Sequence, residues 1–251
     1  MAQEELNVNE VYTTVLAVLN KEQRGYMTPY EFNKIATQVQ LEIFESYFTS
    51  LSLALKQPMN SDIYANNVKI LNQKIARFET EKPITINSNG EGDLTTLSPN
   101  LYKLGAVYFQ NGSLLPVEIE QVDRRSFGLI KRSQLTAPSE SYPIYYKEGY
   151  SIKISPPIAT VVAPADGAPE KTYTVEYIRK PADVVWNYSI GAVGQFVHDT
   201  AAPNQNFQIS SQDQAEVILK ILKYAGVVIR DPEIVQAAAQ AAAAIDQQQM
   251  Q

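Results

Sequence analysis

The chain has 251 residues, 45% of them hydrophobic and 19% charged, which is typical of a globular protein with a sizeable core and excludes a disordered chain. Its net charge of −6, spread as a mild acidic excess over each third of the chain, argues against nucleic acid as a tightly held ligand, because duplex binding depends on neutralising phosphates. The absence of cysteine excludes disulfides, thiolate metal sites and cysteine nucleophiles.

The N-terminal part is predicted to be helical. Residues 1–5 lack the basic and apolar regions of a signal peptide. No apolar run approaches the roughly 18 residues of a membrane span, so we expect a protein made in a cytoplasm, without membrane contact. Asn7, with Glu10 three residues later, predicts the start of a first helix. Its apolar face has helical spacing and consists of Val8, Val11, Tyr12, Val15 and Leu19.

The second helix has a strong start signal. Residues 28–31 combine a threonine cap, a proline at the first helical position and the glutamate of a capping box, which predicts a helix to about Lys56. One apolar stripe consists of Phe32, Ile35, Val39, Ile43 and Tyr47, and a second of Leu41, Phe44, Phe48, Leu51 and Leu55. An apolar arc this wide indicates a helix covered on two sides. We therefore predict that Phe44, Phe48, Leu51 and Leu55 form a subunit interface.

A third helix is predicted after Ser61, with an apolar stripe at 4-3-4-3 spacing that is typical of antiparallel or coiled packing. This stripe consists of Tyr64, Val68, Leu71, Ile75 and Phe78.

From Pro83 the pattern changes to short runs rich in Val, Ile, Thr and Tyr between turn signals, which predicts an antiparallel sheet or sandwich. The expected strands are residues 84–87, 107–110, 117–119, 144–147, 150–154, 159–162, 172–179, 186–188 and 207–209. Residues 121–132 predict a short inserted helix, and a helical pattern returns at Ser211 with Ala215, Ile218, Leu222, Ala225 and Ile229.

The predicted fold class is α+β, a helical bundle with an inserted antiparallel β-sheet or sandwich domain and a protruding C-terminal helix. The helical bundle comprises residues 1–82 and 211–230, the β-rich domain residues 83–210, and the C-terminal docking helix and tail residues 231–251.

The tail has high helix propensity but few apolar residues. Asp231 is a good N-cap, Pro232 fits the first helical position, and an alanine- and glutamine-rich run follows. A slim helix with small side chains permits close approach to another surface, although a solvated or frayed tail explains it equally well. The expected docking residues are Ile234, Val235, Ala238, Ala241, Ala242 and Ile245.

The single histidine, His198, precedes Asp199, and Ser189 or Thr200 could nominally serve as a nucleophile. A lone His–Asp pair in a turn is more often a surface feature. One histidine without cysteine does not provide the three or four ligands that zinc requires. A hydrolase would lose its activity in a His198→Ala variant. We expect no catalytic residue.

Other motifs are equally weak. Residues 89–93 place two acids among glycines without the closing glutamate of a calcium loop, so a β-turn is favoured. Residues 191–194 lack the third glycine of a dinucleotide site. Glu118 and Glu120 face one side of a strand, and a solvated face explains them. The only basic cluster, Arg124, Arg125, Lys131 and Arg132, is more simply a solvated helix face than a nucleic-acid patch. We expect no cofactor and no metal.

Residues 143–146, 150–156 and 173–181 resemble a module of head–tail connector proteins of tailed bacteriophages, in which a "P-x-Y" strand, a hairpin ending in proline and a "V-x-Y-x-R-x-P" strand follow one another. Residues 20–48, with the core 25–33, resemble structural proteins of crAss-like and marine podoviruses. The layout is similar to the tail-tube adaptor of short-tailed phages.

The resemblance implies a virion protein of the neck or tail that forms a homo-oligomeric ring, typically twelve-fold, below the portal. It further implies a C-terminal helix that docks on the portal protein, contacts with other neck or tail rings, and transient passage of DNA without specific binding. The acidic balance fits a channel lining, because like charge keeps DNA from adhering. The alternative is a β-rich binding module for a host surface or carbohydrate, in which the fifteen tyrosines and Trp186 line a sugar platform.

Overall fold

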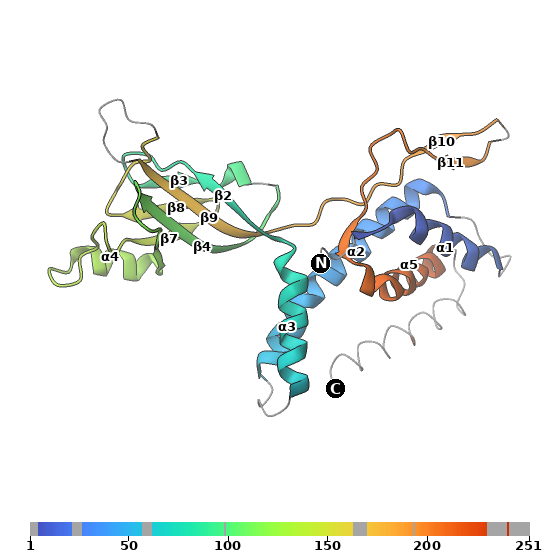
Figure 1. Ribbon diagram of the computed structural model, residues 1–251, viewed down its shortest axis with the longest axis horizontal. Helices are drawn as coiled ribbons and strands as arrows, with labels where there is room; N and C mark the ends of the chain where they lie inside the picture. Colours follow the sequence, from blue (N-terminus) through green and yellow to red (C-terminus); the bar gives the residue numbers. More distant parts are fainter. Residues whose placement is uncertain are drawn as a thin grey trace. The chain divides into compact units, whose positions relative to one another are not determined.

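The computed structural model describes residues 5–21, 27–56, 62–97, 99–162, 170–192, 194–229 and Gln240. The chain forms two compact units (Figure 1). The helical unit combines Met1–Arg77 with Pro181–Gln251, and the β unit is Phe78–Lys180. The predicted α+β class, with helices before and after a β-rich middle, is confirmed.

The helical unit contains α1 (Val8–Lys21), α2 (Pro29–Lys56), α3 (Asp62–Ala76) and α5 (Gln214–Ile229). The predicted face of α1 is buried. The capping box that starts α2 is formed, because the Thr28 amide donates to the Glu31 carboxylate (2.9 Å) and the Glu31 amide to Thr28 Oγ1 (3.3 Å). The Thr28 hydroxyl also donates to the Glu31 carboxylate (2.7 Å), and this bond, together with that from the Thr28 amide, lowers the pKa of Glu31 below its ordinary value. At the start of α1, Asn7 Oδ1 accepts from the Asn9 amide (2.8 Å), so local signals set both helix starts.

Residues 181–187, here called the return segment, bring the chain back from the β unit along α2. Asn33 accepts from the Trp186 amide (2.9 Å) and donates to its carbonyl (3.2 Å). Thr37 accepts from the Val184 amide (3.1 Å), and Gln40 donates to the Ala182 carbonyl (2.7 Å). Seven residues of helix rise about 10 Å and four residues of extended chain about 13 Å. The rise of α2 from Asn33 to Gln40 is thus close to the length of the extended chain from Ala182 to Trp186. Side chains on one face of the helix can therefore bind every second residue of the return segment.

Trp186 anchors the return segment between α1 and α2. It is 3% exposed, its ring lies 4.2 Å from that of Tyr12, and its indole Nε1 donates to Asn9 Oδ1 (3.0 Å). Tyr12 in turn packs on Phe32 at 4.8 Å. The apolar ring is buried and its one polar atom is paired, as a buried tryptophan requires.

Short strands complete the helical unit. β1 (Glu5–Leu6) pairs with β12 (Phe207–Ser210), and β10 (Tyr188–Ile190) forms a hairpin with β11 (Phe196–His198).

A buried polar cluster joins α2, α3 and the 3-10 turn η2 (Ser211–Asp213) that precedes α5. Asp213, 7% exposed, accepts from the Tyr47 hydroxyl (2.5 Å) and the Lys74 ammonium (2.7 Å). Burial, followed by the charges of Asp213 and Glu216, raises the pKa of Tyr47 above its ordinary value. The cluster thus ties the chain after β12 to two helices from the other end of the sequence.

The β unit consists of two four-stranded sheets (Figure 1). One has the order β2 (Glu79–Ile84), β9 (Lys171–Arg179), β4 (Leu101–Asn111), β5 (Val117–Glu118), and all its pairs are antiparallel. The other has the order β3 (Glu91–Asp93), β8 (Ser151–Ser155), β7 (Ile144–Glu148), β6 (Glu120–Gln121), with β6 parallel to β7. A short 3-10 turn, η1 (Thr95–Leu97), follows β3, and α4 (Arg124–Arg132) follows β6.

The two sheets enclose one apolar core. β5 and β6 lie on one continuous stretch, and the Ile119 amide between them donates to the Val107 carbonyl (2.8 Å), so the chain passes from one sheet to the other at a buried residue. Large members of the core are Leu94, Val107, Phe109, Tyr145, Ile152, Tyr173 and Val175. The alternation of buried side chains along β9 is the pattern expected of a sheet with one face inward.

The domain boundaries differ from the prediction. The β unit begins at Phe78 rather than at residue 83 and ends at Lys180 rather than at residue 210. Glu79–Ile84 forms a strand despite its charged residues, because it pairs with β9 along its whole length. Residues 181–210 have the composition of strands but belong to the helical unit. Tertiary contacts decide this, such as those of Trp186 and Ala182 with α2.

Four local predictions also need correction. Residues 84–87 lie mostly beyond β2, and residues 159–162 form only an isolated bridge at Val161. The cap before α5 is Ser210, whose Oγ accepts from the Gln212 amide (3.3 Å). On α5 Ala215 is exposed, and the buried side chains are Val217, Ile221, Leu222 and Ala225. Helical spacing fits both sets of residues, and packing of α5 against α1 and α2 selects the face that is buried.

Candidate interaction surfaces

The predicted interface stripe on α2 is open at one end. Phe44 is fully buried and packs edge-on against Phe48 at 5.1 Å, so Phe44 belongs to the core of the chain. Phe48 and Leu51 are partly buried, and Leu55 is 54% exposed. Exposure therefore increases toward the C-terminal end of α2.

The same face of α2 is covered in its first half. Asn33, Thr37 and Gln40 lie on this face by helical spacing, and the return segment binds them. Beyond Gln40 the face becomes apolar, and its residues Phe48, Leu51 and Leu55 are here called the α2 outer face. Among the described residues, exposure on this face thus increases where the polar residues give way to apolar ones.

A second apolar surface was not predicted from the sequence. Leu129 (63%) and Leu135 (96%) are strongly exposed on and after α4, and four further large side chains of the β unit are exposed in other loops: Leu114 (66%), Leu115 (86%), Tyr142 (80%) and Val162 (69%). These last four are here called the β tip. They come from three separate loops, so no periodic pattern connects them. The only sequence signal is the run Leu114-Leu115-Pro116 directly after the Asn111-Gly112 turn.

His198 is part of an aromatic stack. Its ring lies 5.4 Å from Trp186 at an interplanar angle of 18°, and its buried Nε2 has no hydrogen-bond partner among the described residues. Asp199 instead accepts from the amides of Ala201 (2.9 Å) and Ala202 (3.3 Å), which forms a turn. The structure therefore gives neighbouring Asp199 a turn-forming role rather than that of an imidazole orienter.

The glycine motifs are turns. Gly90 has φ +78°, and the Asn87 side chain accepts from the amides of Asn89 (3.0 Å) and Glu91 (2.9 Å). The two acids are already used, because Glu91 pairs with Lys153 (3.0 Å) and Asp93 accepts from Thr95 (2.6 Å). Gly191 and Gly194 close the loop between β10 and β11. Among the described residues no group of acidic or histidine side chains could hold a metal ion.

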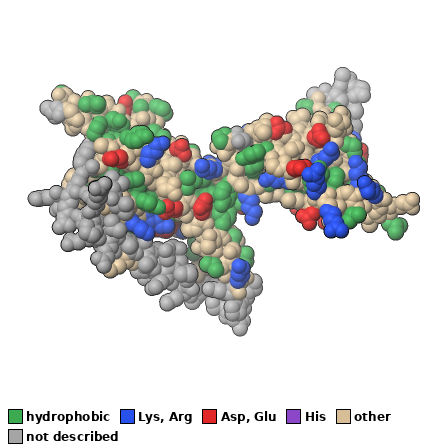
Figure 2. All heavy atoms as spheres, turned by 180° about the vertical axis from the view of Figure 1, so that it is seen from behind, with side chains coloured by type: hydrophobic (Ala, Val, Ile, Leu, Met, Phe, Trp, Pro, Cys, Tyr) green, Lys and Arg blue, Asp and Glu red, His purple; other side chains and the backbone are tan. Residues whose placement is uncertain are grey.

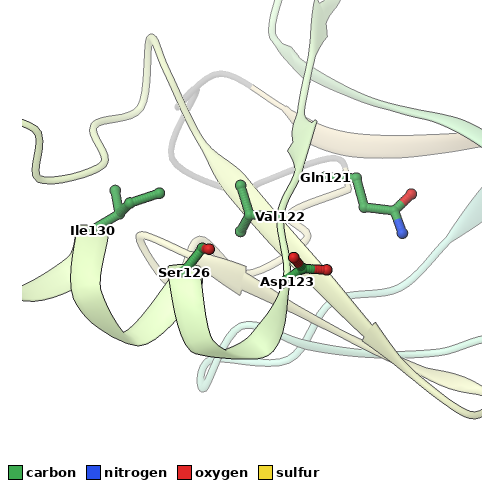
Figure 3. A pocket seen from close by; sticks show the side chains of 5 residues that line it. All are labelled: Gln121, Val122, Asp123, Ser126 and Ile130. Atoms are coloured by element: carbon green, nitrogen blue, oxygen red, sulfur yellow. The ribbon is translucent and has the colours of Figure 1, made fainter.

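A depression of about 480 Å³ lies where β6 leads into α4, lined by Gln121, Val122, Asp123, Ser126 and Ile130. Figure 3 shows Asp123 directly before α4, Ser126 on the first turn of the helix and Ile130 one turn further along. Its lining contributes one carboxylate, one hydroxyl and one amide. A single carboxylate without a second titratable group does not form an acid–base pair.

The basic cluster lies on α4. Phe127 is the buried residue of this helix and packs on Tyr146 at 4.8 Å, while Arg124 pairs with Glu148 (2.5 Å) in an exposed ion pair. On the face seen in Figure 2, Lys and Arg side chains over the β unit alternate with Asp and Glu side chains. This mixture favours a solvated surface over a phosphate-binding patch.

Trp186 belongs to the helical core, so the structure excludes it from a sugar platform of the β-rich module. The predicted docking residues Ile234, Val235, Ala238, Ala241, Ala242 and Ile245 lie outside the described residues. None of the helices in the described part of the chain has the length and apolar character to span a membrane.

The α2 outer face and the β tip are thus two apolar surfaces of the described residues through which this chain can meet another protein. Neither the models of known protein families nor the curated proteins contain a match to this sequence.

Proposed function

We propose that this protein is a structural subunit of a ring at the head–tail junction of a tailed bacteriophage, below the portal. It has no catalytic role and requires no cofactor. The observation that carries the proposal is the α2 outer face, where exposure increases from the buried Phe44 to Leu55. A long helix with an apolar face left open suits association with a neighbouring subunit.

Two further features support a ring of the phage neck. The first is the resemblance of residues 143–146, 150–156, 173–181 and 20–48 to connector and podovirus structural proteins. The second is the net charge of −6, which suits a channel that DNA passes without adhering.

The contact on α2 is tested by comparing two faces of the same helix. A Leu51→Ser/Leu55→Ser variant removes the α2 outer face, whereas Leu53→Ser changes a leucine of similar exposure (43%) on the opposite side. Native mass spectrometry should give large rings for the wild-type chain and for Leu53→Ser, and monomers for the double variant. A wild-type chain that remains monomeric both alone and with portal protein contradicts the ring.

Docking on the portal is proposed for the tail, through Ile234, Val235, Ala238, Ala241, Ala242 and Ile245. A helix with small side chains can become ordered against a partner that supplies the missing burial. Deletion after Pro232 should leave the chain folded and abolish co-purification with the portal. Undiminished co-purification contradicts docking by the tail, and loss of folding places the segment in the core instead.

A further inference from the structure

Two polar residues end the inward-facing rows of β4 and β9. On β9 the buried residues alternate, and Tyr173 and Val175 face the core. By this alternation Lys171 lies on the same side of the strand. On β4 Asn111 follows Phe109 in the inward-facing row and lies opposite Lys171. A lysine and a carboxamide therefore meet at the rim of the apolar core, next to the rings of Phe109 and Tyr173, which lie 5.0 Å apart.

The side chains of Lys171 and Asn111 are close because these residues form the narrow type of antiparallel pair. The amide and the carbonyl of Lys171 are both bonded to Val161 (2.8 Å each), on the other side of the strand. Lys171 therefore exchanges no backbone hydrogen bond with Asn111. The Gly112 amide instead donates to the Glu170 carbonyl (2.6 Å), as this pairing requires. Residues opposite each other in such a pair share one face, with Cβ atoms about 4.5–5.5 Å apart, a separation that the flexible lysine stem spans.

A carboxylate lies beside the lysine nitrogen. Glu140 Oε1 is 3.2 Å from Lys171 Nζ, and the lysine side chain is only 25% exposed. Burial, followed by the charge of Glu140, raises the pKa of Tyr173 above its ordinary value, which places the carboxylate near the inward-facing row as well. An amine next to a carboxylate, partly removed from water, has the arrangement of a nucleophile with its base.

The carboxamide oxygen of Asn111 is exceptional. It is buried and accepts no hydrogen bond from the described residues. Buried polar atoms in folded proteins are almost always paired, so this exception calls for a role beyond the fold itself. Attack on this side chain by the backbone nitrogen of Gly112 is hindered, because that amide already donates to Glu170. Lys171 is therefore the nucleophile that the described structure places to reach Asn111 Cγ.

We propose that Lys171 and Asn111 join in an isopeptide bond within the chain, with Glu140 as the acid–base group. Glu140 takes a proton from the Lys171 ammonium, and the freed lone pair of Nζ attacks Asn111 Cγ. Glu140 passes the proton to Nδ2, the bond from Cγ to Nδ2 breaks, and the second proton lost by Nζ leaves with the ammonia as ammonium. One amide replaces another, so the reaction needs no oxidant and no cofactor.

The reaction is a single self-modification without an external substrate, and it does not depend on the proposed ring function. The fold holds the amine and the carboxamide together, which replaces an encounter between two molecules and makes an otherwise unreactive amide reactive. In the unfolded chain Lys171 and Asn111 are distant, so only the folded protein reacts.

The cross-link would fasten the sheet at its free end. The register of β4 and β9 runs from Leu101 opposite Arg179 to Asn111 opposite Lys171 (Figure 1). The Arg179 amide is bonded to the Phe78 carbonyl (2.8 Å), so both chain crossings of the β unit lie at the Leu101 end. A covalent bond at the other end closes the loop from Asn111 to Lys171 and restricts the unfolded chain, which stabilises the β unit.

The mass of the denatured chain tests the cross-link. After folding, the wild-type protein should be lighter than its 28.0 kDa sequence mass by one ammonia, about 17 Da, because the side-chain nitrogen of Asn111 is the leaving group. Proteolysis should give one branched peptide that contains both Asn111 and Lys171. Lys171→Arg and Glu140→Gln should keep the full mass. Lys153→Arg is the matched control: Lys153 is also ion-paired in the β unit, with Glu91 (3.0 Å), and its variant should lose ammonia as the wild type does.

The outcomes are distinct. A wild-type chain of full mass contradicts the cross-link and leaves Lys171 and Glu140 as an ordinary ion pair. A loss of ammonia that persists in Lys171→Arg is ring closure between Asn111 and Gly112, which contradicts the cross-link as well. A loss that persists in Glu140→Gln contradicts the role of Glu140. Circular dichroism of the variants should match the wild type, and the branched peptide of the wild type decides the question even if a variant does not fold.

Discussion

The helical unit and the β unit are stabilised in different ways. The β unit is one continuous stretch with an apolar core between two sheets. The helical unit joins two ends of the chain, and polar side chains form much of that junction: Asn33, Thr37 and Gln40 on the return segment, and Asp213 on Tyr47 and Lys74. Apolar burial is tolerant of small shifts, whereas paired polar groups are costly when one partner is removed. The helical unit should therefore be the more sensitive to single polar substitutions.

The first prediction concerns the anchor of the return segment. Trp186→Ala removes the ring between α1 and α2, and the helical unit should lose about 3–5 kcal/mol of stability. Hydrogen exchange should show faster exchange in α1 and α2 and unchanged exchange in β4 and β9. Equal acceleration in both units would show that they unfold as one.

A glycine turn provides the corresponding change in the β unit. An added Cβ at Gly90, at φ +78°, would lie 2.6 Å from the Ile154 carbonyl oxygen. Gly90→Ala should destabilise the β unit by about 2–4 kcal/mol through backbone strain and overlap. The matched control is Gly149→Ala, at φ +60° with open space around it, which should lose only about 1 kcal/mol.

The single tryptophan allows unfolding of the helical unit to be followed separately from that of the β unit. Trp186 reports only on the helical unit, so its fluorescence transition in urea should be unchanged in Gly90→Ala while the far-ultraviolet dichroism transition shifts. A coincident shift of both signals would contradict separate units.

A smaller effect is expected for the polar junction. Gln40 is fully buried, donates to the Ala182 carbonyl (2.7 Å) and accepts from the Gln208 amide (2.7 Å). Gln40→Ala should lower stability by about 2 kcal/mol, because both backbone groups lose this partner. Gln38→Ala, on the exposed side of α2, should change stability by less than about 0.5 kcal/mol. Similar losses of stability in the two variants would show that the hydrogen bonds of Gln40 contribute little to stability.

The smallest effect is a dependence on alkaline pH. The hydrogen bond to Glu42, with burial, raises the pKa of Tyr224 to about 12. Because the folded state holds this proton more tightly than the unfolded state, whose tyrosine pKa is about 10, stability is fully present below pH 10 and falls as pH rises toward 12. Tyr224→Phe should make urea midpoints between pH 10 and 12 less dependent on pH. Equal slopes for the variant and the wild type would contradict this linkage.

Local signals account for what the sequence determined by itself. The capping box at Thr28 and Glu31 and the proline at position 58 set α2 from Pro29 to Lys56, and the spacing of Val8, Val11 and Val15 set α1. Alternation of apolar and polar residues, together with turn residues, predicted β7, β8, β9 and β12 to within a few residues. For β4 it predicted only the central part of a longer strand. Caps, periodicity and turns act within one or two turns of chain, so a single sequence contains them.

Tertiary structure decided the rest, because the deciding contacts join residues distant in the chain. Whether residues 181–187 follow the sheet or the helices depends on Asn33 and Gln40, about 150 residues earlier. Whether the second stripe of α2 is core or surface depends on what covers it, so Phe44 is buried and Leu55 exposed although their spacing is equivalent. The β tip exists only because Glu140, Val161 and Asn111 all meet Lys171, an arrangement that no local pattern contains.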